Sequence, residues 1–197
     1  DLFATALSKQ KGREILSGVF NRLQSFLPSK FTEKEEKIVV AQGELLSSQL
    51  FTLLLLENGF SSILLPALDF MRIDGNRAAD LPAIKTLFSG IFSSAPKVDY
   101  YITQGFICRN PKGEIDNLER GGSDYTASLL GAAMDAEEIQ IWTDIDGFHN
   151  NDPRFVENTR KIDQLSFVEA AELAYFGAKI LHPQTVLPAR EQNIPVR

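Results

Sequence analysis

Apolar positions spaced three and four apart predict helices in the first third of the chain. Across residues 2–27 this spacing predicts two helices that are joined near residues 11–12. A second apolar run covers residues 44–57, follows a charged patch at residues 33–37, and ends at the Asn-Gly pair 58–59, which is typical of a helix C-terminus. Because apolar residues nearly surround this second run, we expect it to form a buried helix.

Short apolar runs alternate with further helical segments over the rest of the chain. Asp80 before Leu81 and Pro82 is typical of a helix N-terminus, and Ser166 with Glu169 forms a capping box. Strands are predicted at residues 62–65, 100–106 and 139–142, a hairpin at residues 108–118, and helices at residues 81–92, 123–134 and 166–176, with a last helix opened by Pro183.

The alternation of strands and helices predicts an α/β fold, a three-layer α/β/α sandwich with a mostly parallel sheet. Residues 93–97 have the loosest composition and indicate a join between two lobes. We therefore expect an N-terminal lobe at residues 1–95 and a C-terminal lobe at residues 96–197.

Composition and charge exclude several classes of protein. The 197 residues are 44% hydrophobic, which is enough for one substantial core or two small lobes and excludes disordered and fibrous proteins. A net charge of -6 provides no broad basic surface, so we expect neither nucleic acid nor an anionic membrane as a partner. The longest unbroken apolar stretches fall short of the ~20 residues that cross a bilayer, so we expect no membrane-spanning segment.

Cysteine and histidine content limits the compartment and the metal chemistry. Cys108 is the single cysteine and cannot close an intrachain disulfide, and no secretory signal pattern opens the chain, so we expect the reducing cytoplasm. Cys108 with the distant His149 and His182 matches no zinc pattern. We therefore predict no metal-ligating residues.

The strongest candidate for chemistry is the segment at residues 118–126, where a hairpin is followed by a helix. Gly121 and Gly122 let the main chain approach a ligand, and the free amides of the following helix favour a phosphate or carboxylate. Arg120 adds a guanidinium that can bind a carboxylate through two hydrogen bonds. The alternative is a tight turn capped by Ser123 with Arg120 in solvent, and this segment alone leaves both interpretations open.

A second candidate is the polar segment at residues 142–154, which follows a predicted strand. Such a segment lies at the carboxyl edge of the sheet, where open α/β proteins bind ligands. Its acidic side chains could hold Mg²⁺ or ribose hydroxyls, and Arg154 could reach a phosphate. Asp, Asn and Gly are also good turn formers, so by itself the segment is better explained as an Asx-rich loop.

Two isolated charges each allow two interpretations. Glu44 follows Gly43 at the predicted start of an apolar helix, where a carboxylate either stabilises the helix dipole or binds a substrate ammonium. Lys179 stands alone in the apolar segment at residues 176–183, where either its stem lies along apolar surface or its ammonium binds a phosphate.

Taken together, these segments resemble the aspartokinase family from about residue 33 to the end of the chain. The motifs that carry the resemblance, in this order and spacing, are Gln-Gly-Glu at 42–44, Ile-Thr-Gln-Gly-Phe-Ile at 102–107, Gly-Gly-Ser-Asp-Tyr-Thr-Ala at 121–127, Trp-Thr-Asp at 142–144, Asp-Pro-Arg at 152–154 and Phe-Gly-Ala-Lys-Ile-Leu-His-Pro at 176–183. The resemblance implies the amino-acid kinase fold. It also implies transfer of the ATP γ-phosphate, with Mg²⁺, to the β-carboxylate of L-aspartate in lysine, threonine and methionine synthesis.

The resemblance further implies roles for individual residues. Glu44 would bind the ammonium of aspartate and Arg120 its α-carboxylate, with Phe106 and Ser123 lining the pocket. Asp124 would organise the catalytic lysine and the transferring phosphate. The residues that would surround ATP are Gly121, Gly122, Thr143, Asp144, His149, Asp152, Arg154, Lys179 and Ile180, with Lys179 near the phosphates.

Three departures from the family pattern shape these expectations. The family begins with a strand and a Lys-Phe-Gly-Gly-Thr segment that supplies its main catalytic lysine, which this chain lacks, and it continues into regulatory ACT domains. His149 also stands where the family usually has tyrosine. We therefore expect a catalytic domain that is inactive by itself and that forms a homodimer or larger assembly through other regions.

Two other interpretations remain. One is a related kinase that acts on glutamate, a nucleotide or carbamate, which the pairing of Glu44 with Arg120 disfavours because that pair suits an α-amino acid. The other is a non-catalytic ligand-binding or oligomerisation module of the same fold, which the absence of the lysine segment favours.

Overall fold

The chain divides into two compact units, residues 1–118 and residues 119–197. The computed structural model describes residues 2–26, 31–119, 121–143, 147–151, 155–175 and 186–197. The join expected at residues 93–97 lies inside the first unit, because strand β2 (Tyr100–Ile102) pairs with strand β1 (Ser62–Leu64) and so belongs with the residues before it.

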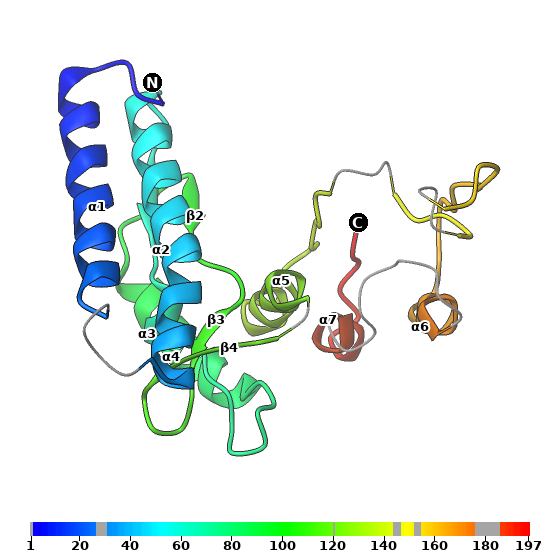
Figure 1. Cartoon of the computed structure of the whole chain (residues 1–197). Helices are drawn as coiled ribbons and strands as arrows, with labels where there is room; N and C mark the ends of the chain where they lie inside the picture. The colour runs from blue at the N-terminus through cyan, green and yellow to red at the C-terminus, as the bar shows by residue number, and fades with distance from the viewer. Residues whose placement is uncertain (1, 27–30, 120, 144–146, 152–154, 176–185) are drawn as a thin grey trace. The chain divides into compact units, whose positions relative to one another are not determined.

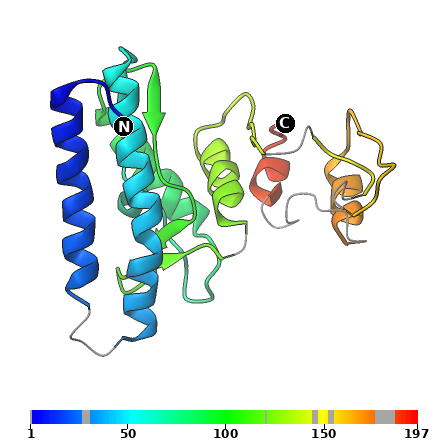
Figure 2. The same ribbon diagram turned by 45° about the horizontal axis from the view of Figure 1, so that its top comes forward.

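Helices α1 (Ala6–Gln24) and α2 (Glu33–Glu57) lie side by side at one edge of the first unit (Figures 1 and 2). The predicted break at residues 11–12 is wrong, since α1 is continuous. Gly12 serves packing instead, because a Cβ at this position would lie 2.7 Å from Cε2 of Phe3. The chain before α1 is held by Glu57 at the end of α2, whose carboxylate accepts hydrogen bonds from the amides of Ala4 (3.0 Å) and Thr5 (2.7 Å).

Helix α2 begins at Glu33, well before the predicted start. A capping box of Thr32 and Glu35 opens it, and the acidic charges of the first turn suit the positive end of the helix dipole. The expectation of a buried helix is also wrong, because Val40 and Phe51 are about half exposed while Ala41 is among the buried positions.

By length and composition alone, α2 could cross a membrane, and it is the one helix of the described part of the chain for which this holds. The expectation of no membrane-spanning segment was based on unbroken apolar stretches only. In α2, polar residues lie between the apolar ones, so this helix contains no long unbroken stretch. Core helices of globular domains meet the same criterion, and α2 packs against α1, β1 and β4 (Ile115–Asn117).

The parallel pairing of β1 with β2 matches Ser62 with Tyr100 and Leu64 with Ile102. The crossover between them contains helices α3 (Ala67–Phe70) and α4 (Leu81–Ser94). Helix α4 starts as predicted, with the Asp80 carboxylate accepting a hydrogen bond from the amide of Ala83 at 3.0 Å. The apolar core between these elements includes a chain of ring contacts through Phe70, Phe88, Phe92 and Tyr101.

Strands β3 (Ile107–Arg109) and β4 form the predicted antiparallel hairpin. Cys108 is fully buried in it. Asp116 on β4 is buried as well and accepts hydrogen bonds from Lys37 of α2 (3.1 Å) and from the amide of Asn117 (2.8 Å). The hairpin is therefore tied to α2 by a largely buried ion pair.

The second unit is built around α5 (Gly122–Ala133), with α6 (Phe167–Tyr175) and α7 (Leu187–Glu191). Its core contains Ile139, Ala189 and Ile194. Gly131 of α5 lets this core form, because a Cβ there would lie 2.5 Å from Cδ1 of Ile139. The Ser166 capping box opens α6 as predicted.

The strand predicted at residues 139–142 is reduced to a bridge. Ile139 forms a parallel bridge with Val196, and the amide of Ile141 donates to the carbonyl of Arg197 at 2.7 Å. The helix predicted to open at Pro183 falls at a position outside the described residues, and α7 begins at Leu187.

Candidate functional site

Glu44, the predicted partner of a substrate ammonium, lies in the middle of α2 and is half-buried. The helix-dipole interpretation of this residue is wrong, because the dipole acts within the first turn and the helix begins at Glu33. The helix dipole therefore does not explain this carboxylate, and its binding of a substrate ammonium stays a prediction.

Phe106, the predicted pocket residue of the first unit, lies in the connection between β2 and β3. Its φ of 69° is in the left-handed region, which a bulky residue rarely adopts. The conformation is held on both sides, because the amide of Ile107 donates to the carbonyl of Gly105 (2.7 Å) and the amide of Leu118 donates to the carbonyl of Phe106 (2.8 Å). Backbone strain of this kind costs roughly 1–3 kcal/mol and clusters at ligand sites.

Gln104 and Ser48 connect the two positions just described and were not singled out from the sequence. Gln104 is 2% exposed, and its Nε2 donates to Ser48 Oγ at 2.6 Å. Ser48 is one helical turn after Glu44, and its Oγ donates to the Glu44 carbonyl at 2.7 Å. The sequence carries no signal for this pair, because Gln104 and Ser48 are 56 residues apart and only the folded chain brings them together.

The first turn of α5 carries the candidate residues of the second unit. Gly121 adopts a left-handed φ of 72°, a conformation that favours glycine. Gly122, the first residue of α5, is buried. Gly121 is the N-cap and has no side chain to cap the amides at the helix start, although the amide of Gly122 donates to the carbonyl of Glu119 at 3.1 Å. Ser123 is exposed and Asp124 half-buried, and burial raises the pKa of the Asp124 carboxyl.

The predicted nucleotide residues of the second unit are described in part. Thr143 is exposed. His149 is half-buried, forms an antiparallel bridge with Lys161, and places Nδ1 2.9 Å from Oγ1 of Thr159. The remaining predicted site residues lie outside the described residues: Arg120, Asp144, Asp152, Arg154, Lys179 and Ile180.

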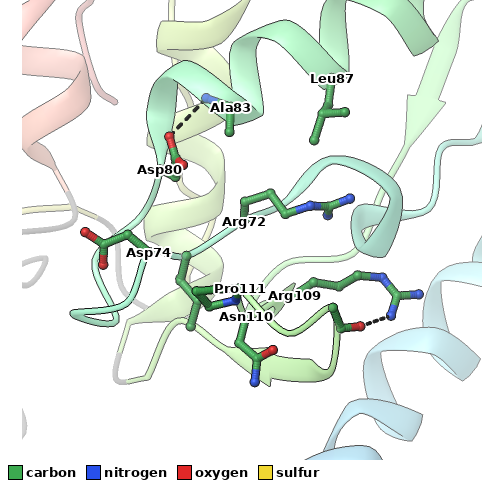
Figure 3. Close-up of a pocket in the computed structure, with 10 residues that line it drawn as sticks. Arg72, Asp74, Asp80, Ala83, Leu87, Arg109, Asn110 and Pro111 are labelled. Atoms are coloured by element: carbon green, nitrogen blue, oxygen red, sulfur yellow. Dashed lines mark hydrogen bonds between the residues drawn. The ribbon is translucent and has the colours of Figure 1, made fainter.

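An open pocket of about 360 Å³ lies between α4 and the turn of the β3–β4 hairpin (Figure 3). Arg72 and Arg109 line it, but both guanidinium groups are engaged by the main chain, since each donates a hydrogen bond to the carbonyl of Leu68 (3.0 and 2.9 Å). Asp80, on the same wall, caps α4. No predicted site residue lines this pocket, and its charged groups are occupied by structural contacts.

Within the described part of the chain, no group of three or more His, Cys, Asp or Glu side chains could hold a metal ion. The prediction of no metal-ligating residues stays a prediction. A magnesium ion usually keeps several waters and binds through one or two carboxylates together with substrate phosphates, so it does not require such a cluster.

The chain belongs to the amino acid kinase family, because the sequence model of that family matches residues 5–197. It is similar to lysine-sensitive aspartokinase 3 of Escherichia coli (strain K12), with 42% identity over 161 residues that cover 80% of this chain and 36% of that protein. It is also similar to aspartokinase 1 of Bacillus subtilis (strain 168), with 34% identity over 169 residues that cover 86% of this chain and 42% of that protein.

Among solved structures, the chain resembles E. coli aspartokinase III in complex with aspartate and ADP, with a TM-score of 0.83 and 34% identity. The match covers 95% of this chain and 42% of that one. This likeness confirms the predicted α/β fold of the amino-acid kinase type. The chain spans between 36% and 42% of the length of these three relatives.

Proposed function

We propose that this chain carries the catalytic domain of an aspartate kinase, which transfers the γ-phosphate of ATP to the β-carboxylate of L-aspartate and forms 4-phospho-L-aspartate. One observation carries the proposal: the fold matches, over 95% of the chain, a structure of an aspartokinase that holds aspartate and ADP. The motifs quoted above supply side chains suited to the same two ligands.

Aspartate would be held by its two α-substituents. Glu44 would pair with the ammonium, Arg120 would bind the α-carboxylate through its guanidinium fork, and Phe106 and Ser123 would line the pocket. A carboxylate and a guanidinium at a fixed separation orient a zwitterion in one direction only. The β-carboxylate would then be presented for attack on the γ-phosphate, and such positioning is a large part of catalysis in phosphoryl transfer.

The nucleotide would bind to the second unit. The N-terminus of α5, which has no side-chain cap, suits phosphate oxygens. Asp124 in its first turn would organise the catalytic lysine and the transferring phosphate. The residues proposed to surround ATP are Gly121, Gly122, Thr143, Asp144, His149, Asp152, Arg154, Lys179 and Ile180. Mg²⁺ bound to the phosphates would neutralise charge that develops during transfer.

We further propose an N-terminal aspartate-binding lobe and a C-terminal nucleotide-binding lobe, a cytoplasmic location, and a homodimer or larger assembly. The similarity to aspartokinases, which are longer than this chain, supports these proposals. The chain would act as part of such a protein, and residues 1–197 by themselves would form little acyl phosphate.

The experiment is to replace Glu44 by glutamine, which keeps the shape of the side chain and removes its charge. L-Aspartate binding is measured by calorimetry and acyl phosphate is trapped with hydroxylamine, both on residues 1–197 and on the protein with any flanking residues that its gene encodes. Loss of a charge-assisted hydrogen bond costs about 1.5–3 kcal/mol, so aspartate affinity should fall roughly ten- to a hundredfold. L-Glutamate as a competing substrate separates aspartate kinase from a glutamate kinase of the same fold.

Glu36→Gln is the matched control, because Glu36 lies on the same helix, is exposed and has no proposed contact with substrate. Its aspartate affinity should equal that of the unmodified protein, and its unfolding midpoint should fall only slightly, through the loss of one first-turn charge that suits the helix dipole. Arg120→Ala should weaken aspartate binding in the same way and leave nucleotide binding intact. Unchanged aspartate affinity in Glu44→Gln would overturn the proposal.

A further inference from the structure

An uninterrupted hydrogen-bonded chain runs from the start of α3 to the turn of α2 that contains Glu44. The amide of Ala67 donates to Gln104 Oε1 at 2.8 Å, and Gln104 Nε2 donates to Ser48 Oγ at 2.6 Å. Ser48 Oγ in turn donates to the carbonyl of Glu44 at 2.7 Å, the shorter of its two main-chain contacts. The start of α3, the residues after β2 and helix α2 therefore meet at the buried side chain of Gln104.

The direction of every bond in this chain is determined by its first member. The main-chain N–H of Ala67 can only donate, so the oxygen of the Gln104 amide must face it and the nitrogen must face Ser48. Ser48 Oγ therefore accepts from Gln104, and its own proton is directed to the carbonyl of Glu44. No member can reverse without leaving a buried donor or acceptor unpaired, which makes the arrangement rigid.

One end of this hydrogen-bonded series is a residue of the proposed aspartate pocket, and its central member, Gln104, is close in sequence to another. Glu44 supplies the last acceptor, and Phe106 follows Gln104 by two residues in the strained connection before β3. Displacement of the Gln104 side chain would thus move the turn of α2 that contains Glu44 relative to the loop that contains Phe106. All of these residues belong to the first unit.

We propose that Gln104 is a positioning residue for aspartate recognition, which acts through Ser48 to hold the Glu44 turn of α2 against the loop of Phe106. This inference rests on the proposed function. Gln104 does not contact substrate in this account. Its effect is on the affinity for aspartate, through the separation of Glu44 and Phe106, and not on the binding of nucleotide.

Helix α2 offers a matched control for the Ser48 hydroxyl. Thr52 lies one turn further along α2, is 8% exposed like Ser48, and its Oγ1 donates to the carbonyl of Ser48 at 2.8 Å. Ser48→Ala and Thr52→Ala each remove a hydroxyl that donates to a main-chain carbonyl of the preceding helical turn, and both keep every main-chain hydrogen bond of α2. Only Ser48→Ala also removes the acceptor of the Gln104 amide.

The test measures L-aspartate affinity, ADP affinity and unfolding midpoint for Ser48→Ala, Ser48→Thr, Thr52→Ala and Gln104→Asn, in the protein with any flanking residues its gene encodes. Loss of one hydrogen bond corresponds to a change of roughly three- to tenfold in an equilibrium constant. We expect Ser48→Ala to weaken aspartate binding by that factor with ADP binding unchanged, and Ser48→Thr to restore it by returning the hydroxyl. Gln104→Asn, whose shorter amide cannot span both partners, should match or exceed Ser48→Ala.

Thr52→Ala should lower the unfolding midpoint and leave aspartate affinity unchanged. Equal effects of Ser48→Ala and Thr52→Ala on aspartate, or equal weakening of aspartate and ADP, would overturn the inference, because either result would indicate a role in stability alone. If the unmodified protein binds ADP but not aspartate, the proposed function fails and this inference fails with it. If it binds aspartate and all four variants do so equally, only the inference fails.

Discussion

The ion pair between Lys37 and Asp116 should contribute measurably to stability, because it is largely buried. Nζ of Lys37 lies 3.0 Å from Oδ1 of Asp116, and the two side chains are 17% and 5% exposed. Lys37→Met removes the charge and keeps the length of the side chain, so the carboxylate stays buried with fewer partners. Removal of one member of a fully buried pair costs about 3–5 kcal/mol.

Two features of the structure reduce this cost. The Lys37 ammonium retains some access to solvent, and the Asp116 carboxylate keeps the amide of Asn117 at 2.8 Å and Nη2 of Arg77 at 3.5 Å. We therefore expect the free energy of unfolding to fall by about 2 kcal/mol, measured by urea denaturation with circular dichroism. Replacement of both partners, Lys37→Met with Asp116→Leu, should recover most of the loss because no charge remains buried.

Lys34 supplies the control, since it forms an ion pair of similar length from the preceding turn of α2. Its Nζ lies 2.9 Å from Oε1 of Glu114, but the side chains are 55% and 33% exposed. Lys34→Met should change stability little, because exposed ion pairs are weak. Equal losses for Lys34→Met and Lys37→Met, or no loss for Lys37→Met, would refute the argument that burial gives the second pair its strength.

Glu57, Cys108 and Gly131 allow further measurements. Two main-chain amides and a threonine hydroxyl hold the pKa of Glu57 to about 2, below its usual 4.5. Its stabilisation of the α1 start is therefore complete above pH 4.5 and disappears as pH falls through 2. The hydrogen-exchange protection of α1, measured relative to the intrinsic exchange rate at each pH, should fall across that window, and Glu57→Gln should remove this dependence. Burial raises the pKa of the Cys108 thiol to about 12, so a disulfide reagent should label the folded chain at pH 8 far more slowly than the urea-unfolded chain. Gly131→Ala should destabilise by about 1–3 kcal/mol, because its Cβ would lie 2.5 Å from Ile139, whereas Gly90→Ala in α4 has free space and should stabilise by roughly 0.5–1 kcal/mol in the same urea titration.

The elements that begin with a specific local signal were predicted closely from the sequence. The N-cap Asp80 and the capping box of Ser166 and Glu169 act through hydrogen bonds over three residues, so their geometry depends little on the rest of the fold. The break at Gly12 was predicted wrongly because tertiary packing decides it. The glycine accommodates the ring of Phe3, a contact that helical propensity does not reveal. The start of α2 was predicted too late although a local signal, the capping box of Thr32 and Glu35, opens this helix.

The candidate site residues rest on motifs and not on periodicity, and their roles stay predictions. The helix expected from residue 123 is present as α5, but it begins at Gly122 and its N-cap is Gly121 and not Ser123. The role of Gln104 was out of reach, because its partner Ser48 is 56 residues away and only the folded chain brings the two together. The position of Glu44 inside a long helix likewise depends on where α2 begins, and that start is set by the capping box of Thr32 and Glu35.

The parallel pairing of β1 with β2 imposes an order on folding during synthesis. The α1–α2 hairpin consists of neighbouring segments and can form as soon as residue 57 leaves the ribosome, whereas Ser62 must wait for Tyr100. Lys37 likewise emerges long before Asp116. A nascent chain that ends before residue 100 would therefore present a completed helical hairpin beside an unpaired strand, with the ammonium of Lys37 still in water.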